Sequence, residues 1–155
     1  MTYELRIERL FDASPEAVFD AYVDPATQEE LHGSAQPGWI VHRSETDVRE
    51  GGTSTTEMGM EGQGSDTETR VFSVVDRPNR LVFRNSIGGA NWGPGVESEV
   101  TITFEDQDGK TLVTVVQSGF ENEQDRDRFQ YGWPIQLDIL KGIVERSTLK
   151  ARHDA

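Results

Sequence analysis

Hydrophobic and polar residues alternate through the first ten positions of the chain. Tyr3, Leu5 and Ile7 fall on one face of an extended segment, and charged side chains occupy the other face. This period of two predicts a half-buried first strand over residues 3–10.

Two proline-containing signals follow the first strand and predict two short helices. Ser14-Pro15-Glu16 combines a hydroxyl N-cap, a proline at the first helical position and an acid in the first turn. This signal predicts a helix that runs to about Tyr22. Asp24-Pro25 repeats the cap and the proline, and it predicts a second helix that ends near Leu31.

From Trp39 onward, β-prone segments are separated by turn residues at intervals of about ten positions, which predicts an antiparallel meander of six strands. Val100, Ile102 and Phe104 alternate with polar residues, so their strand should have one buried face. Residues 111–116 are apolar on both faces, which predicts a strand covered by helices on both sides. The turn residues lie at 51–52, 61–66, 77–79, 88–95 and 108–109.

The last third of the chain has helical periodicity. Asn122 is a candidate cap, and Pro134 inside the pattern predicts one kinked helix. The polar residues 150–155 are predicted to fray. Residues 1–155 are therefore predicted to form a single α+β domain, with a curved antiparallel sheet of about seven strands around a long C-terminal helix. The apolar stripe of this helix comprises Phe129, Trp133, Leu137, Leu140 and Val144.

Composition narrows the classes of partner and the chemistry that the chain can use. The net charge is −13, from 28 acidic and 15 basic residues, which argues against nucleic acid and anionic membranes as partners. No segment reaches the roughly 20 apolar residues of a membrane span, and the first residues lack signal-peptide features, so we expect a cytoplasmic protein. The absence of cysteine excludes disulfides, thiolate metal sites and a cysteine nucleophile.

Several local motifs, in this order, resemble the Hsp90 ATPase activator homologue family of the START-like (SRPBCC) superfamily. The resemblance covers residues 3 to about 146. It implies a helix-grip fold with a cavity between the sheet and the long helix, in a family whose members bind or process diverse apolar small molecules. Relatives often carry tryptophan where this chain has Leu31-His32-Gly33. The motifs are residues 11–22 with Asp24-Pro25, then Gly51-Gly52, residues 76–83, residues 109–111, and Gly132-Trp133 with Leu137, Asp138 and Leu140.

In such a fold, apolar residues on inward faces are the candidates for the pocket wall. Trp92 lies in a glycine-rich loop, where it is a candidate lid over the pocket mouth; a tryptophan folded onto the surface is the alternative. The apolar candidates for the pocket wall could equally well be ordinary core residues. The predicted ligand-binding residues are Met58, Met60, Phe72, Phe83, Trp92, Val100, Ile102, Trp133, Leu137 and Leu140.

Three polar residues are weak candidates for catalysis. Glu57 lies in a polar strand and Arg84 in a mostly apolar one; if both point inward, they could act as acid and base on an enolisable ketone, as in related cyclases. Charges on the outer face are the alternative. His32 lies near the end of the second helix, where it either stabilises the helix dipole or lies at the pocket entrance. The histidine spacing matches no zinc motif, so we expect no metal and no cofactor.

These observations leave three functions open. The first is a non-enzymatic binder of a hydrophobic small molecule or lipid, and the second is a polyketide cyclase or isomerase-like enzyme that uses the same cavity. The third is a chaperone (Hsp90-type) interaction module in stress response. An apolar void would favour the first, a void with converging polar groups the second, and a filled interior the third. A homodimer is a further open alternative.

Overall fold

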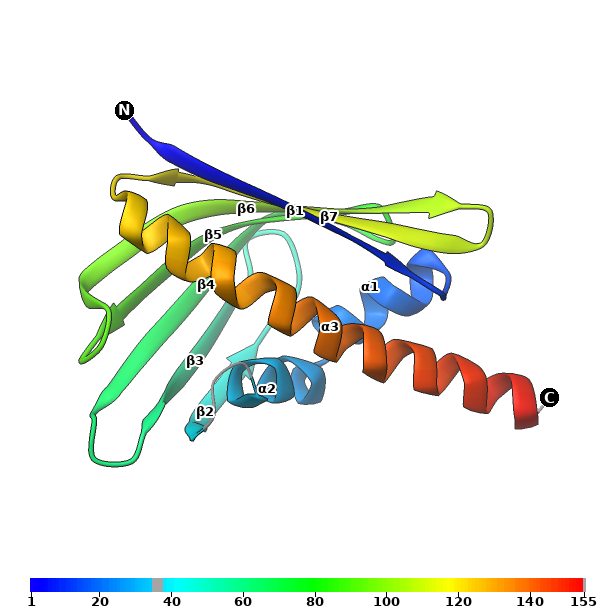
Figure 1. The fold of residues 1–155 in the computed structure, drawn as a ribbon, viewed down its shortest axis with the longest axis horizontal. Helices are drawn as coiled ribbons and strands as arrows, with labels where there is room; N and C mark the ends of the chain where they lie inside the picture. The colour runs from blue at the N-terminus through cyan, green and yellow to red at the C-terminus, as the bar shows by residue number, and fades with distance from the viewer. Residues whose placement is uncertain (35–37, 155) are drawn as a thin grey trace.

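The computed structural model describes residues 1–34 and 38–154, without the side chains of residues 34 and 151–154. This part of the chain forms a curved antiparallel sheet that holds the long helix α3 against one face (Figure 1). The strands are β1 (Tyr3–Phe11), β2 (Trp39–Thr46), β3 (Thr53–Met60), β4 (Ser65–Asp76), β5 (Arg80–Gly89), β6 (Gly93–Gln107) and β7 (Lys110–Phe120). The helices are α1 (Pro15–Val23), α2 (Pro25–Ser34) and α3 (Glu123–Asp154).

The seven strands form one sheet in the order β1-β7-β6-β5-β4-β3-β2. Strands β2 to β7 pair with their neighbours in sequence, whereas β1 pairs with β7, with Phe11 opposite Thr111. This pairing brings the first strand beside the last one, and α3, which follows β7, crosses the face of the sheet (Figure 1). The α+β class, the strand number and the two short helices predicted from sequence are confirmed.

The predicted caps are present at the helix starts. The Ser14 hydroxyl accepts a hydrogen bond from the Ala17 amide at 3.3 Å, with Pro15 in the first turn of α1. An Asp24 carboxylate oxygen accepts from the Ala26 amide at 2.8 Å. The side-chain oxygen of Asn122 accepts from the Gln124 amide at 2.8 Å, which fixes the start of α3.

Helix α3 is continuous over 32 residues and contains Pro134. The helix continues through Asp154, so it includes residues 150–154, which were predicted to fray. No glycine or proline follows Gly142, and residues such as Leu149 and Lys150 are good helix formers. The polar composition of the tail therefore does not end the helix.

Both α1 and α3 cover the same face of the sheet. Phe19 of α1 packs edge-on against Phe104 of β6, with ring centroids 5.1 Å apart. Trp133 of α3 donates a hydrogen bond to Gln117 of β7, on the same face as Phe104. The predicted covering of residues 111–116 on both faces is therefore wrong. Thr114, on the opposite face, is buried between the adjacent strands β1 and β6.

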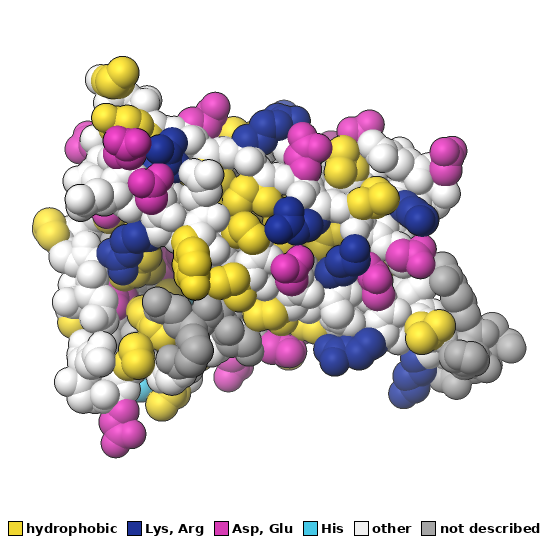
Figure 2. Space-filling view, viewed as in Figure 1, with side chains coloured by type: hydrophobic (Ala, Val, Ile, Leu, Met, Phe, Trp, Pro, Cys, Tyr) yellow, Lys and Arg dark blue, Asp and Glu magenta, His cyan; other side chains and the backbone are white. Residues whose placement is uncertain are grey.

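Part of the hydrophobic core lies under the middle of α3, where Leu137, Leu140 and Val144 are buried. The first half of α3 passes over a more open part of the sheet, which contains the candidate site. In the space-filling view, acidic and basic side chains are interspersed over the surface, with hydrophobic side chains visible between them (Figure 2). Among the described residues, no helix is long and apolar enough to cross a membrane.

Candidate functional site

A cavity of about 520 Å³ lies between the sheet and the first half of α3. Its volume falls in the range of roughly 300–1,000 Å³ that is usual for small-molecule sites. Strands β3, β5 and β6 and helix α3 all contribute to it. Its apolar lining includes Met58, Ile87, Val100, Phe129 and Trp133.

All three tryptophans of the chain line this cavity. Trp39 comes from the start of β2, Trp92 from the turn between β5 and β6, and Trp133 from α3. Since the three indoles come from separate elements and meet at one cavity, tryptophan fluorescence should report directly on what enters it.

Trp92 is held in place from two sides. The buried carboxylate of Asp66 accepts hydrogen bonds from the Trp92 amide at 2.9 Å and from the Asn91 amide at 3.0 Å. On the other side, the indole packs on Phe129 with centroids 5.0 Å apart, and the guanidinium of Arg128 lies 3.4 Å from the indole centroid. The turn that carries Trp92 is therefore fastened to both β4 and α3.

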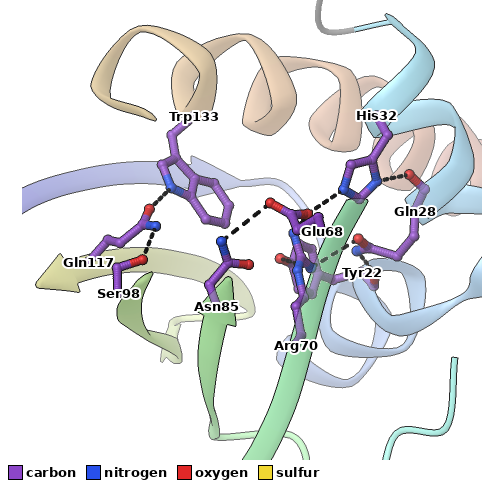
Figure 3. Close-up of polar contacts among 9 residues, drawn as sticks. All are labelled: Tyr22, Gln28, His32, Glu68, Arg70, Asn85, Ser98, Gln117 and Trp133. Atoms are coloured by element: carbon purple, nitrogen blue, oxygen red, sulfur yellow. Dashed lines mark hydrogen bonds and ion pairs between the residues drawn. The ribbon is translucent and has the colours of Figure 1, made fainter. Parts of the chain in front are cut away.

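Four side chains that line the cavity form a buried polar cluster, defined as His32, Glu68, Arg70 and Asn85 (Figure 3). Glu68 lies at its centre. One carboxylate oxygen of Glu68 lies 2.7 Å from His32 Nε2 and 3.3 Å from Arg70 Nη2. The other accepts a hydrogen bond from the Asn85 amide group at 3.3 Å.

Residues of the two short helices, α1 and α2, accept hydrogen bonds from Arg70 of the buried polar cluster. Arg70 Nη1 donates to the Tyr22 hydroxyl at 3.2 Å and to the Gln28 side-chain oxygen at 3.1 Å. The Gln28 amide group donates in turn to the Tyr22 carbonyl. The guanidinium carbon of Arg70 also lies 4.7 Å from the centroid of the Phe83 ring. The cluster therefore connects α1, α2, β4 and β5.

The surroundings of Glu68 keep it ionised. Burial by itself would raise the pKa of this carboxyl, but the charge of Arg70 and the interactions with His32 and Asn85 outweigh burial. The pKa of Glu68 is lowered from its ordinary 4.5 to about 2. Burial raises the pKa of the Tyr22 hydroxyl, so Tyr22 stays neutral beside Arg70.

This lowered pKa predicts an acid-sensitive contribution to stability. A carboxyl whose pKa is lower in the folded state stabilises fully above its unfolded pKa, and the contribution disappears as pH falls from about 4.5 to about 2. At about 1.4 kcal/mol per pKa unit, the expected loss is about 3 kcal/mol. Urea unfolding of the wild type and of Glu68→Gln over this pH range measures it, because the variant has no carboxyl at this position. A stability difference between the two that does not shrink in acid would contradict the prediction.

A second polar chain orients Trp133. The indole N–H donates to Gln117 Oε1 at 2.7 Å, and Gln117 Nε2 donates to the Ser98 hydroxyl at 2.8 Å (Figure 3). Gln117 and Ser98 are buried on β7 and β6. These bonds fix the plane of one indole in the cavity wall.

The structure brings together only some of the residues proposed from sequence. Met58, Trp92, Val100, Trp133 and His32 line the cavity. The other proposed wall residues do not, because a cavity wall and a packed core have the same pattern of inward apolar positions. Of these, Met60 is half-buried at the end of β3, whereas the buried core contains Phe72, Phe83, Ile102, Leu137 and Leu140.

The proposed inward pair of Glu57 and Arg84 is wrong. Thr56 and Met58 are the buried neighbours on β3, so Glu57 points to the opposite face. Arg84 is exposed, and its nearest acidic partner is Glu97 at 3.8 Å. The predicted pairing fails because strand side chains alternate, and both residues occupy outward positions.

The inward charges lie instead on β4, which sequence reasoning missed. Asp66, Glu68 and Arg70 alternate with exposed or half-buried residues and share their face with the buried Phe72. This period of two, leading to a core phenylalanine, is the signal that could have identified them. Among the described residues, no group of three or more His, Asp or Glu is placed to hold a metal ion.

Solved structures with the same fold come from several bacteria. Protein CV1439 from Chromobacterium violaceum is similar with a TM-score of 0.78 and 21% identity, over 92% of this chain and 97% of that chain. The AHSA1 (SPO3351) protein from Silicibacter pomeroyi has a TM-score of 0.76 and 21% identity, over 94% and 99%. CalU16 from Micromonospora echinospora has a TM-score of 0.63 and 20% identity, over 99% and 83%. These likenesses show a shared helix-grip fold.

A comparison with curated proteins found no match. A family model described as "Activator of Hsp90 ATPase homolog 1-like protein" matches residues 12–145, which include every residue of the buried polar cluster and all three tryptophans. The resemblance seen in the sequence motifs is thereby confirmed. The chain belongs to the Activator of Hsp90 ATPase homolog 1-like family.

Proposed function

We propose that this protein binds an apolar small molecule in the cavity between α3 and the sheet, without converting it chemically. The observation that carries the proposal is the cavity of about 520 Å³, walled by apolar side chains and three tryptophans. A protein of this size normally packs its interior with few voids larger than a water molecule. A cavity this large is therefore best explained by an occupant.

Family membership supports the same proposal, since this family commonly binds hydrophobic ligands. The chaperone-module alternative needs a filled interior and a functional outer surface. The size of the cavity argues against it.

The buried polar cluster is the one observation that favours the enzyme alternative, because polar groups converge on the cavity. However, a carboxyl with a pKa of about 2 is a poor general base at neutral pH. Both ring nitrogens of His32 are also occupied, by Glu68 and by the Gln28 carbonyl. A group that orients a ligand needs neither a shifted proton nor a free ring nitrogen, so binding explains the cluster better.

Trp92 is proposed to close the mouth of the cavity as an aromatic lid. Replacing Trp92 with alanine should weaken ligand binding about threefold to tenfold, the loss expected from about 0.5–1.5 kcal/mol of aromatic contact. Stability should fall by only about 0.5–1.5 kcal/mol, from the lost contact with Phe129, because Trp92 is partly buried and Asp66 still holds the backbone of the turn. Calorimetric titration and urea unfolding of the same samples separate the two effects. Unchanged affinity would remove the lid from the proposal.

Native mass spectrometry of the purified protein tests the proposed function, because a ligand that co-purifies adds a defined mass. We expect either such an adduct or binding from a panel of apolar probes. Gentle heating in organic solvent should remove the adduct, and identification of the released compound would give the ligand class. A ligand-free spectrum together with no binding from the panel would overturn the proposal.

A further inference from the structure

We propose that the ligand carries an acidic group, a carboxylate or another oxyanion, that lies beside Arg70 and His32 at the inner end of the cavity. This inference rests on the proposed function and goes one step further, since it names the chemical class of the ligand. The remainder of the ligand is apolar and lies along Met58, Val100 and Trp133.

Both ring nitrogens of His32 donate hydrogen bonds. His32 Nδ1 lies 2.7 Å from the carbonyl oxygen of Gln28, and Nε2 lies 2.7 Å from Glu68 Oε1. A carbonyl and an ionised carboxylate can only accept, so both nitrogens must donate. An imidazole with a hydrogen on each nitrogen is a cation. The buried polar cluster therefore contains two cations, His32 and Arg70, and one anion, Glu68.

Arg70 has more N–H groups than the described residues around it accept. A guanidinium has five N–H groups, and the structure gives Arg70 three hydrogen bonds, to Tyr22, Gln28 and Glu68. Two N–H groups therefore have no acceptor among the described residues, and Nε is fully buried without a partner. Asn85 likewise uses one of its two amide hydrogens, in its bond to Glu68. Three N–H groups of the buried polar cluster therefore have no acceptor among the described residues.

The charges of the residues that line the cavity also favour an acidic group on the ligand. At the exposed side of the cavity, Asp127 pairs with Arg126 at 2.7 Å, and Arg128 lies near the carboxylates of Asp125 and Asp66. Asp66 is a further buried anion on β4, but it does not line the cavity, and its carboxylate accepts three hydrogen bonds from Asn91 and Trp92. At the inner end of the cavity, the two cations and one anion of the buried polar cluster therefore leave one positive charge without an opposite charge in the lining. An unpaired buried charge is costly, and an oxyanion in the cavity would neutralise it and accept those unused N–H groups that face the cavity.

This preference runs against the net charge of the chain. At −13, the protein as a whole attracts cations and repels anions. If the net charge of the protein decided which ligand binds most tightly, an amine would be favoured. If the buried polar cluster decides, an acid is favoured. The two explanations predict opposite orders of affinity, which makes the preference a sharp test.

The test compares decanoic acid, 1-decanol and decylamine, which share one hydrocarbon chain, by calorimetric titration of the full protein at neutral pH. Tryptophan emission provides a second readout from inside the cavity. We expect decanoate to bind at least about tenfold more tightly than decanol, and decylamine to bind most weakly. Decanol binding as tightly as decanoate would overturn this inference while the proposed function stands. No binding by any of the three would also overturn this inference, whereas the proposed function falls only if the native mass spectrum and the panel of apolar probes show no ligand either.

Single substitutions then test where in the cavity the carboxylate of decanoate lies. His32→Gln removes one cation and retains an N–H group that can reach Glu68, so we expect decanoate affinity to fall about tenfold and decanol affinity to change about twofold or less. Arg84→Gln, on the outer face, is the matched control for loss of a positive charge. Circular dichroism establishes that each variant is folded; if His32→Gln is not, the three-probe comparison in the wild type decides alone. If Arg128→Gln abolishes the acid preference and His32→Gln does not, the acid lies at the mouth and the inference is wrong.

Discussion

Replacing Glu68 with glutamine is expected to lower the free energy of unfolding at neutral pH by about 3–5 kcal/mol, the usual cost of breaking a buried ion pair. The substitution retains the shape of the side chain but removes the only anion of the buried polar cluster. Arg70 and His32 then remain buried with no opposite charge beside them. Urea denaturation followed by circular dichroism measures the loss.

Glu97→Gln is the matched control for this substitution. It makes the same chemical change on the outer face, where Glu97 is exposed and lies 3.8 Å from Arg84. Exposed ion pairs contribute about 0–1 kcal/mol, so this variant should unfold close to the wild type. Equal, small losses in both variants would show that the charges around Glu68 do not stabilise the fold.

Replacing Gly132 with phenylalanine is expected to weaken ligand binding by at least about tenfold without lowering stability. Gly132 lines the cavity from α3, and a Cβ added there meets no atom within 4 Å. The new ring would therefore occupy the space that the ligand needs. Phenylalanine also favours a helix more than glycine does, so the folded state should not be weakened. Titration with decanoic acid, followed by urea unfolding, measures both quantities.

Gly142→Phe is the control on the same helix. A Cβ at Gly142 also meets no atom within 4 Å, but Gly142 does not line the cavity. Its effect on helix stability should match that of Gly132→Phe, while binding should remain at the wild-type level. If both variants bind like the wild type, the ligand lies elsewhere.

Much of the fold could be predicted from sequence because its signals are local. The Ser14-Pro15 and Asp24-Pro25 caps act within a few residues, and both helices begin where these caps predict. The strands follow turn residues such as Asp108-Gly109, where both residues adopt positive φ. The extent of α3 was harder to predict, since polarity alone does not end a helix.

The site was harder to predict because it depends on contacts that are distant in sequence. His32 and Glu68 are 36 positions apart, and no spacing rule connects a residue of α2 with one of β4. Which apolar residues line a void and which fill the core depends on how far α3 lies from the sheet. Val100 and Ile102 share one strand face and one pattern, yet only Val100 lines the cavity.

The buried polar cluster connects stability with ligand choice in this account. Charges that hold α1 and α2 against the sheet also face the ligand, so a substitution such as Glu68→Gln changes both properties. Gly132→Phe and the choice of probe, by contrast, change binding without removing a charge from the cluster.

A crystal structure of the protein with decanoic acid tests the central claim most directly, because it locates the probe. We expect a hydrocarbon chain between α3 and the sheet, in contact with Val100 and Trp133, and a carboxylate within hydrogen-bonding distance of Arg70. Decanoic acid bound only on the outer surface, with the cavity closed by repacked side chains, would contradict the account.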